Sequence, residues 1–270
     1  MNFKYLFPLL FLFSCAQNEN KLSSQNDNSS LNIESNEIET EKEANSKKEL
    51  KLSTSESKDK FVSNKDTLKA SSYVGLDNLT DIQSLDPTIL IDLKYASTDN
   101  FMKQQLYFDI DKVYLQKDVA ERIVKVQAYL KSIRSDLTLL IYDGVRPLSV
   151  QKAMWKALDT IPVKDRVKFV SNPASGSIHN YGAAIDLTLA YKNGKALDMG
   201  AGYDDISEIA YPRLEAEFLA KGELTSQQVE NRKLLRKVMK SQGFSNIPTE
   251  WWHFNACSRA QAKIKYKILQ

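Results

Sequence analysis

Histidine and cysteine are the scarcest reactive residues of this chain, which has two of each among 270 residues. Two cysteines cannot build the disulfide framework of a small secreted domain. Neither sign of charge prevails, because 37 basic residues face 34 acidic ones, and the sequence shows no concentrated basic stretch of the kind that binds nucleic acid. No long apolar run follows residue 15, so we expect no membrane-spanning helix beyond that point.

The N-terminus has the layout of a secretory signal. Lys4 precedes an apolar run, from Leu6 to Phe13, that is too short to cross a bilayer as a helix. The order Leu12-Phe13-Ser14-Cys15 resembles the lipobox of bacterial lipoproteins, which implies a signal peptide over residues 1–15 and a lipid on Cys15. We therefore expect export and a lipid anchor to a bacterial membrane, with the domain facing the periplasm or the cell exterior. The alternative is an ordinary secretion signal with a chance cysteine.

Residues 16–72 differ sharply in composition from the rest of the chain. They mix Ser, Asn, Glu and Lys, and Phe61 is their only aromatic residue. Such a segment cannot bury enough apolar surface to offset the entropy lost on folding, which predicts a disordered linker. If Cys15 carries lipid, Cys257 has no partner for an intramolecular disulfide.

Residues 73–270 are expected to form one α+β domain, in which a small, mostly antiparallel sheet is packed by helices. Val119, Ile123, Val126, Leu130 and Ile133 recur at helical spacing and predict an amphipathic helix. A second expected helix begins at a Ser149 cap and runs through Trp155. A third extends from Glu223 to Lys240. The expected strands are Thr88–Tyr95, Leu137–Tyr142, Ala183–Leu189 and Trp251–Ala256, with a hairpin turn at Asn193–Gly194.

The two histidines both lie near acidic residues in strand-like, aromatic surroundings. His179 and Asp186 are seven residues apart, and Gly182 between them favours a turn that leads into a strand. His253 is the only other histidine. Two histidines and one carboxylate suit a single Zn²⁺ with a fourth position open to water, so these three residues are the predicted metal ligands.

Glu250 stands three residues before His253, where a local bend brings it beside the metal without making it a ligand. There it is predicted to act as the general base on the water and to pass the proton to the leaving amine. Each of these residues alone also has an ordinary structural interpretation, as a surface or core histidine or a turn-capping aspartate. Their joint occurrence favours the metal site.

The segments that carry these residues resemble the motifs of a known family. The motif Ser-x-His-x-x-Gly-x-Ala-x-Asp over residues 177–186 and the Glu-x-x-His ending at His253 resemble the D-alanyl-D-alanine dipeptidases of the VanX type, which are zinc peptidases. The segments 143–147 and 197–205 are also similar to that family, over about residues 75–270. The resemblance implies that Arg146 stabilises the oxyanion of a tetrahedral intermediate and that Ser177 helps to hold the substrate.

The implied function is hydrolysis of D-Ala-D-Ala, linked to cell-wall peptide metabolism, with a small D-amino-acid dipeptide or a cell-wall peptide as the partner. A D,D- or L,D-carboxypeptidase acting on peptidoglycan stems would share every catalytic residue. A serine acyl-enzyme is suggested by Ser149-x-x-Lys152 and by Thr98-Asp99-Asn100, but these occur in the wrong order and no Lys-Thr-Gly follows. A cell-wall-binding lipoprotein without turnover is the non-enzymatic alternative.

Overall fold

The computed structural model describes residues 73–167 and 169–270. They form an α+β unit on a five-stranded sheet with the strand order β2-β4-β5-β7-β6. β2 runs parallel to β4 and the other neighbours are antiparallel, so the predicted small, mostly antiparallel sheet packed by helices is confirmed. The predicted signal peptide, Cys15 and the predicted linker up to residue 72 lie outside the described residues. Among the described residues, no helix has the length and apolarity needed to cross a bilayer.

The main sheet consists of β2 (Leu90–Ile91), β4 (Leu137–Asp143), β5 (Ala184–Tyr191), β6 (Ser245–Ile247) and β7 (Glu250–Asn255). A separate antiparallel pair joins β1 (Thr80–Asp81) to β3 (Tyr114–Leu115). The α-helices are α2 (Ile82–Leu85), α3 (Lys117–Ile133), α4 (Leu148–Ala157), α5 (Val163–Arg166), α6 (Glu215–Ala220), α7 (Ser226–Ser241) and α8 (Arg259–Lys265). The short 3-10 turns are η1 (Leu76–Asn78), η2 (Lys94–Ala96), η3 (Ile178–Tyr181), η4 (Glu208–Ala210) and η5 (Pro212–Leu214).

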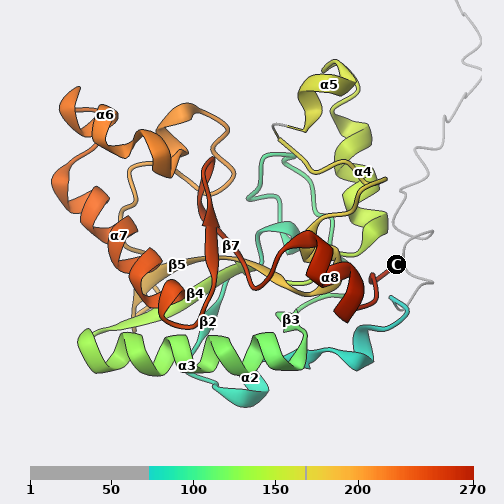
Figure 1. Cartoon of the computed structure of the whole chain (residues 1–270), viewed down its shortest axis with the longest axis horizontal. Helices are drawn as coiled ribbons and strands as arrows, with labels where there is room; N and C mark the ends of the chain where they lie inside the picture. The colour runs from blue at the N-terminus through green and yellow to red at the C-terminus, as the bar shows by residue number, and fades with distance from the viewer. Residues whose placement is uncertain (1–72, 168) are drawn as a thin grey trace, which may run out of the picture. The chain divides into compact units, whose positions relative to one another are not determined.

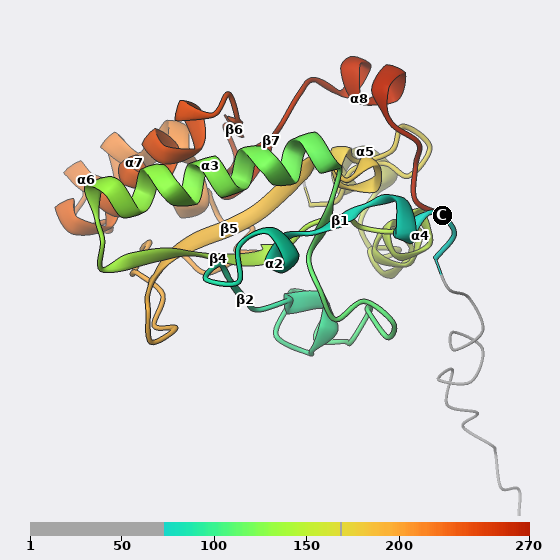
Figure 2. The same ribbon diagram turned by 90° about the horizontal axis from the view of Figure 1, so that it is seen from below.

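Helices α3 and α7 pack against each other and against the middle of the sheet (Figures 1 and 2). The apolar stripe predicted for α3 is buried at Val119, Ile123, Val126 and Leu130, whereas Ile133 at the helix end is 37% exposed. α7 begins after Thr225, whose hydroxyl accepts the Gln228 backbone N–H in a capping box. The two long helices therefore form where helical periodicity and, for α7, a capping signal agree.

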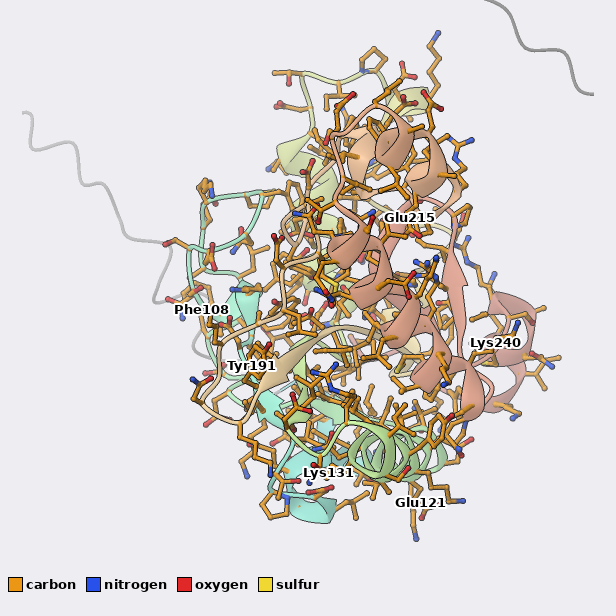
Figure 3. The ribbon with its side chains drawn as sticks, turned by 90° about the vertical axis from the view of Figure 1, so that its left-hand side faces the viewer. Phe108, Glu121, Lys131, Tyr191, Glu215 and Lys240 are labelled. Carbon is orange, nitrogen blue, oxygen red and sulfur yellow. The ribbon has the colours of Figure 1, made fainter. Side chains whose placement is uncertain are left out.

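The strands β4 and β5 form the centre of the sheet. All seven residues of β4 are buried, and so is β5 up to Ala190. Both faces are covered, which explains why these strands are nearly continuous in apolar residues. β5 ends at Tyr191, which is partly exposed at the far end of the sheet (Figure 3). The turn at Asn193–Gly194 follows it as predicted, with the Gly194 N–H donating to the Tyr191 carbonyl.

Two local predictions were wrong. The strand expected over residues 88–95 pairs with β4 only at β2, because the chain then turns into η2. The Asn100 side-chain amide donates to the Lys94, Ser97 and Gln104 carbonyls and draws this segment into a closed loop. Ser149 does not cap α4, which begins at Leu148 after Pro147 with no side-chain cap.

A buried arginine ties the segment before α6 to α7. Arg232 is fully buried, and its guanidinium donates to the Met199 carbonyl at 2.6 Å and to the Ile209 carbonyl at 3.0 Å. Glu215 at the start of α6 lies beside α7 (Figure 3) and accepts both terminal nitrogens of Arg236. Because buried charge-assisted hydrogen bonds are strong and directional, the segment 199–209 is fixed at both ends.

Candidate metal centre and active site

Three predicted ligands converge on one point at the middle of the sheet. Asp186 of β5 and His253 of β7 are directly paired across the two strands, and their Oδ1 and Nδ1 atoms are 3.0 Å apart. The Nε2 atom of His179 lies 3.1 Å from Nδ1 of His253 and 3.3 Å from Oδ1 of Asp186. Ligands about 2.0–2.1 Å from a tetrahedral zinc lie about 3.3 Å from one another, so the spacing suits a single ion.

His179 is brought back over β5 by the turn that the sequence predicted. Ser177 and Asn180 form a capping box around η3, and Gly182 ends the turn with a φ of 64°, a conformation that glycine adopts without strain. The Asn180 side chain also donates to the Arg146 carbonyl. The turn that positions His179 is thus locked to the segment that bears Arg146.

The hydrogen bonds of the two imidazoles leave one lone pair on each directed at the shared point. Nδ1 of His179 lies 2.7 Å from the Gly144 carbonyl, which can only accept, so Nδ1 carries the proton and Nε2 is free. Nε2 of His253 lies 2.9 Å from Oδ1 of Asn255, which leaves Nδ1 facing Asp186. Outer hydrogen bonds of this kind orient metal-binding histidines.

Asp186 and His253 influence each other's protonation strongly. Burial disfavours charge on both, but their mutual hydrogen bond and opposite charges outweigh it for His253 and raise its pKa to about 9. For Asp186, burial disfavours the carboxylate and so raises the pKa, but the neighbouring His179 and His253 outweigh this and hold the pKa below its usual range. A metal ion and a proton therefore compete for Nδ1 of His253, as expected of a metal ligand.

Arg146 follows the end of β4, and its guanidinium lies beside the three predicted metal ligands. Its Nε and one terminal nitrogen donate to Oδ2 of Asp143 at 3.0 and 2.6 Å, and its guanidinium stacks over the Tyr95 ring at 4.9 Å. Burial lowers its pKa, but the Asp143 charge outweighs this and holds the pKa well above the usual value. The same terminal nitrogen lies 3.6 Å from Oδ2 of Asp186, so a fixed positive charge lies beside the predicted ligand set.

Glu250 approaches from the start of β7 without joining the three ligands. Its Oε2 lies 3.7 Å from Nδ1 of His253, and 29% of its side chain is exposed. Burial raises the pKa of Glu250, which makes its carboxylate a better proton acceptor near neutral pH. The Asn246 side-chain amide donates to the backbone carbonyls of both Glu250 and His253, at 2.8 and 2.7 Å, and fixes the bend between them.

These side chains line one pocket of about 160 Å³. The lining includes His179, Asp186, His253, Glu250 and Arg146, which the sequence analysis singled out. Ser177 also lines it, and its hydroxyl accepts the His179 backbone N–H at 3.3 Å. Trp252 also lines this pocket, whereas Tyr181 lines another cavity.

Sequence reasoning gave no role to Tyr203 and Asp204, although it noted their segment. The Tyr203 hydroxyl donates to Oδ2 of Asp186 at 3.0 Å. Asp204 lines the pocket, accepts from the Tyr95 hydroxyl, and has a pKa raised to about 7 by burial and by the Asp186 charge. Its φ of 60° is unusual for a residue other than glycine and indicates local strain, often found at functional positions.

Two histidines and a carboxylate around one point, with a second carboxylate and a buried arginine beside them, define a metallopeptidase site. The family model for D-Ala-D-Ala dipeptidases of peptidase class M15 matches residues 76–269. The chain belongs to this family and is a metallopeptidase.

The chain is similar to curated proteins over the same region. It is 34% identical to the D-alanyl-D-alanine dipeptidase of Escherichia coli K12 over 176 residues, which cover 65% of this chain and 83% of the relative. The Enterococcus faecalis D-alanyl-D-alanine dipeptidase is 30% identical, with 60% and 83% covered. A solved structure of the LdcB LD-carboxypeptidase is 19% identical with a TM-score of 0.35, covering 58% of this chain and 66% of that one.

The serine acyl-enzyme and the non-enzymatic lipoprotein are the alternatives that lose support. Neither Ser149 nor Lys152 lines the pocket that holds the histidines. Both Glu250 and Arg146, whose absence would have favoured a protein without turnover, lie in that pocket. Together with the family membership, this excludes both alternatives.

Proposed function

We propose that this enzyme hydrolyses the dipeptide D-Ala-D-Ala with a zinc-activated water, using one zinc ion per chain. The observation that carries the proposal is the convergence of His179 Nε2, Asp186 Oδ1 and His253 Nδ1 within hydrogen-bonding distance of one another. Zinc held by these three residues would supply Lewis acidity, which lowers the pKa of a bound water molecule to about 7. Nitrogen and carboxylate donors with one open position suit zinc, and the family membership supplies the substrate class.

The roles of the surrounding residues follow from their positions. Glu250 takes the proton from the attacking water and passes it to the amine of the departing D-alanine. Arg146, held in place by Asp143, stabilises the negative charge that develops on the carbonyl oxygen of the substrate. Ser177 borders the same pocket and helps to hold the substrate, while its hydroxyl stabilises the turn that carries His179.

A small zwitterion suits the pocket better than a long peptide. Its volume of about 160 Å³ lies below the roughly 300–1,000 Å³ that drug-sized ligands occupy. Asp204 offers a buried carboxylate for the substrate's ammonium group, because an arriving positive charge relieves the cost of burying a negative one. A peptidoglycan stem has an amide at that position in place of a free amine. We therefore favour the dipeptide over a D,D- or L,D-carboxypeptidase substrate.

One assay tests this function. The purified protein should release D-alanine from D-Ala-D-Ala, lose that activity in EDTA and regain it with zinc. N-acetyl-D-Ala-D-Ala, which lacks the ammonium group, should be a poor substrate. Activity that resists the chelator would refute the metal mechanism. Preferential cleavage of the acetylated dipeptide or of a muropeptide would instead favour a carboxypeptidase.

We also propose that the enzyme is exported and held at a bacterial membrane by a lipid on Cys15. Support comes from the lipobox-like segment Leu12–Cys15 and from the polar linker over residues 16–72, which suits a spacer. Wild-type cells grown with labelled palmitate should yield a labelled membrane-bound protein, and C15S should yield an unlabelled one. Equal label in both proteins, or none in the wild type, would contradict the anchor.

A further inference from the structure

The pocket lined by the three predicted metal ligands is also lined by Arg259, to which the proposed mechanism assigns no role. Arg259 is the first residue of α8, is exposed, and lines the pocket together with Asn255 and Ser177. Within residues 73–167 and 169–270, its guanidinium makes no hydrogen bond or ion pair. An unpaired guanidinium beside a substrate pocket is available to bind an anionic group of the substrate.

The other charged groups of the pocket are already engaged. Arg146 is bound to Asp143 by two hydrogen bonds and stacks on Tyr95. Asp186 belongs to the ligand set, and Glu250 is the proposed base. Asp204 is the proposed acceptor for the substrate's ammonium group. A dipeptide zwitterion also carries a carboxylate, and Arg259 is the remaining cation in the pocket lining that can bind it.

Asp204 and Arg259 lie at different parts of the pocket. Asp204 also lines an adjoining small cavity together with Phe101, Ile206 and Tyr211, whereas Arg259 does not line that cavity. In Figure 1, α8 lies on one side of β7 and the segment leading into α6 lies on the other. The two opposite charges therefore come from different segments of the lining, the loop before α6 and the start of α8, and can contact the two ends of a dipeptide.

We infer that Arg259 binds the C-terminal carboxylate of the substrate and makes the enzyme selective for a free acid at that end. The inference rests on the proposed dipeptidase activity. It assigns the carboxylate-bearing D-alanine, which departs with its newly freed amine, to the α8 side of the pocket. Arg259 contacts the substrate away from the reacting atoms, so it affects binding more than the chemical step.

The test compares D-Ala-D-Ala with its C-terminal amide as substrates of the zinc-loaded, full-length enzyme. R259M should lower kcat/KM for the free acid by about 10-fold, mainly through KM, because an exposed ion pair contributes less than a buried one. Turnover of the amide should change little, so the preference for the acid should collapse. R259K should restore part of that preference. K263M, which removes an exposed charge from the same helix outside the pocket, should behave as the wild type.

An unchanged acid-to-amide ratio in R259M would overturn the inference while leaving the dipeptidase activity intact. An equal loss on both substrates would also overturn it, because it would indicate a structural effect of the substitution. Failure of the wild-type enzyme to hydrolyse either substrate would refute the proposed function itself, and the inference with it.

Discussion

Replacing Glu250 by glutamine should leave one zinc per chain and lower kcat by about 10²–10⁴-fold. Glutamine keeps the size of the side chain but cannot accept a proton from water. Glu250 lies 3.7 Å from Nδ1 of His253 and outside the cluster of three ligand atoms, so its loss should not release the metal. Metal analysis and steady-state kinetics on the same purified sample measure the two effects together.

The matched control is E223Q, which makes the same chemical change at an exposed position outside the pocket. It should keep both zinc and activity. Full activity in E250Q would remove the base from the mechanism. Loss of zinc in E250Q would instead mean that Glu250 is a ligand and that the ligand set is wrong.

Replacing His253 by alanine should leave the protein without stoichiometric zinc and reduce its activity to background. Only His179 and Asp186 would remain of the three predicted ligands, and two donors are too few for a tight zinc site. The substitution also leaves the Asp186 carboxylate buried without its 3.0 Å partner, so the folded state should lose stability as well. Metal analysis after gel filtration tests the first effect, and thermal unfolding tests the second.

A graded companion variant separates metal binding from folding. Asn255 accepts a hydrogen bond from Nε2 of His253 and is not a ligand, so N255A should weaken zinc binding by about 10–100-fold without abolishing it. Stoichiometric zinc in H253A would refute the proposed ligand set. The order of zinc affinity should be wild type, then N255A, then H253A.

The three side chains that converge in the structure could be picked out from the sequence because histidine is so scarce. With only His179 and His253 available, any two-histidine site must use both, and Gly182 predicted the turn that folds His179 back over its strand. Helix α3 was equally visible because its apolar residues recur at helical spacing, and β4 and β5 were visible because each is a nearly continuous apolar run.

Contacts between distant segments were not predictable in this way. The Asp204 side chain, for example, meets the Tyr95 hydroxyl across 109 positions of the chain. This contact has no local signature, because it depends on how distant loops return to the sheet. The bend fixed by Asn246 and the shortened strand after Thr88 have a different origin, because both depend on side-chain hydrogen bonds to nearby backbone carbonyls that apolar periodicity does not reveal. The strand propensity of this segment was outweighed by the three hydrogen bonds that the Asn100 side-chain amide donates to backbone carbonyls.

Because Asp186 and His253 are paired across β5 and β7, metal binding would also affect how accurately these two strands align during folding. Neighbouring residues of a strand point to opposite faces, so a slip of β7 by one position against β5 would turn His253 away from Asp186. Zinc would then find an incomplete ligand set. Its binding free energy is therefore gained only when the two strands are correctly aligned. The ion that is proposed to activate water would therefore also favour the correct register of the two strands that bind it.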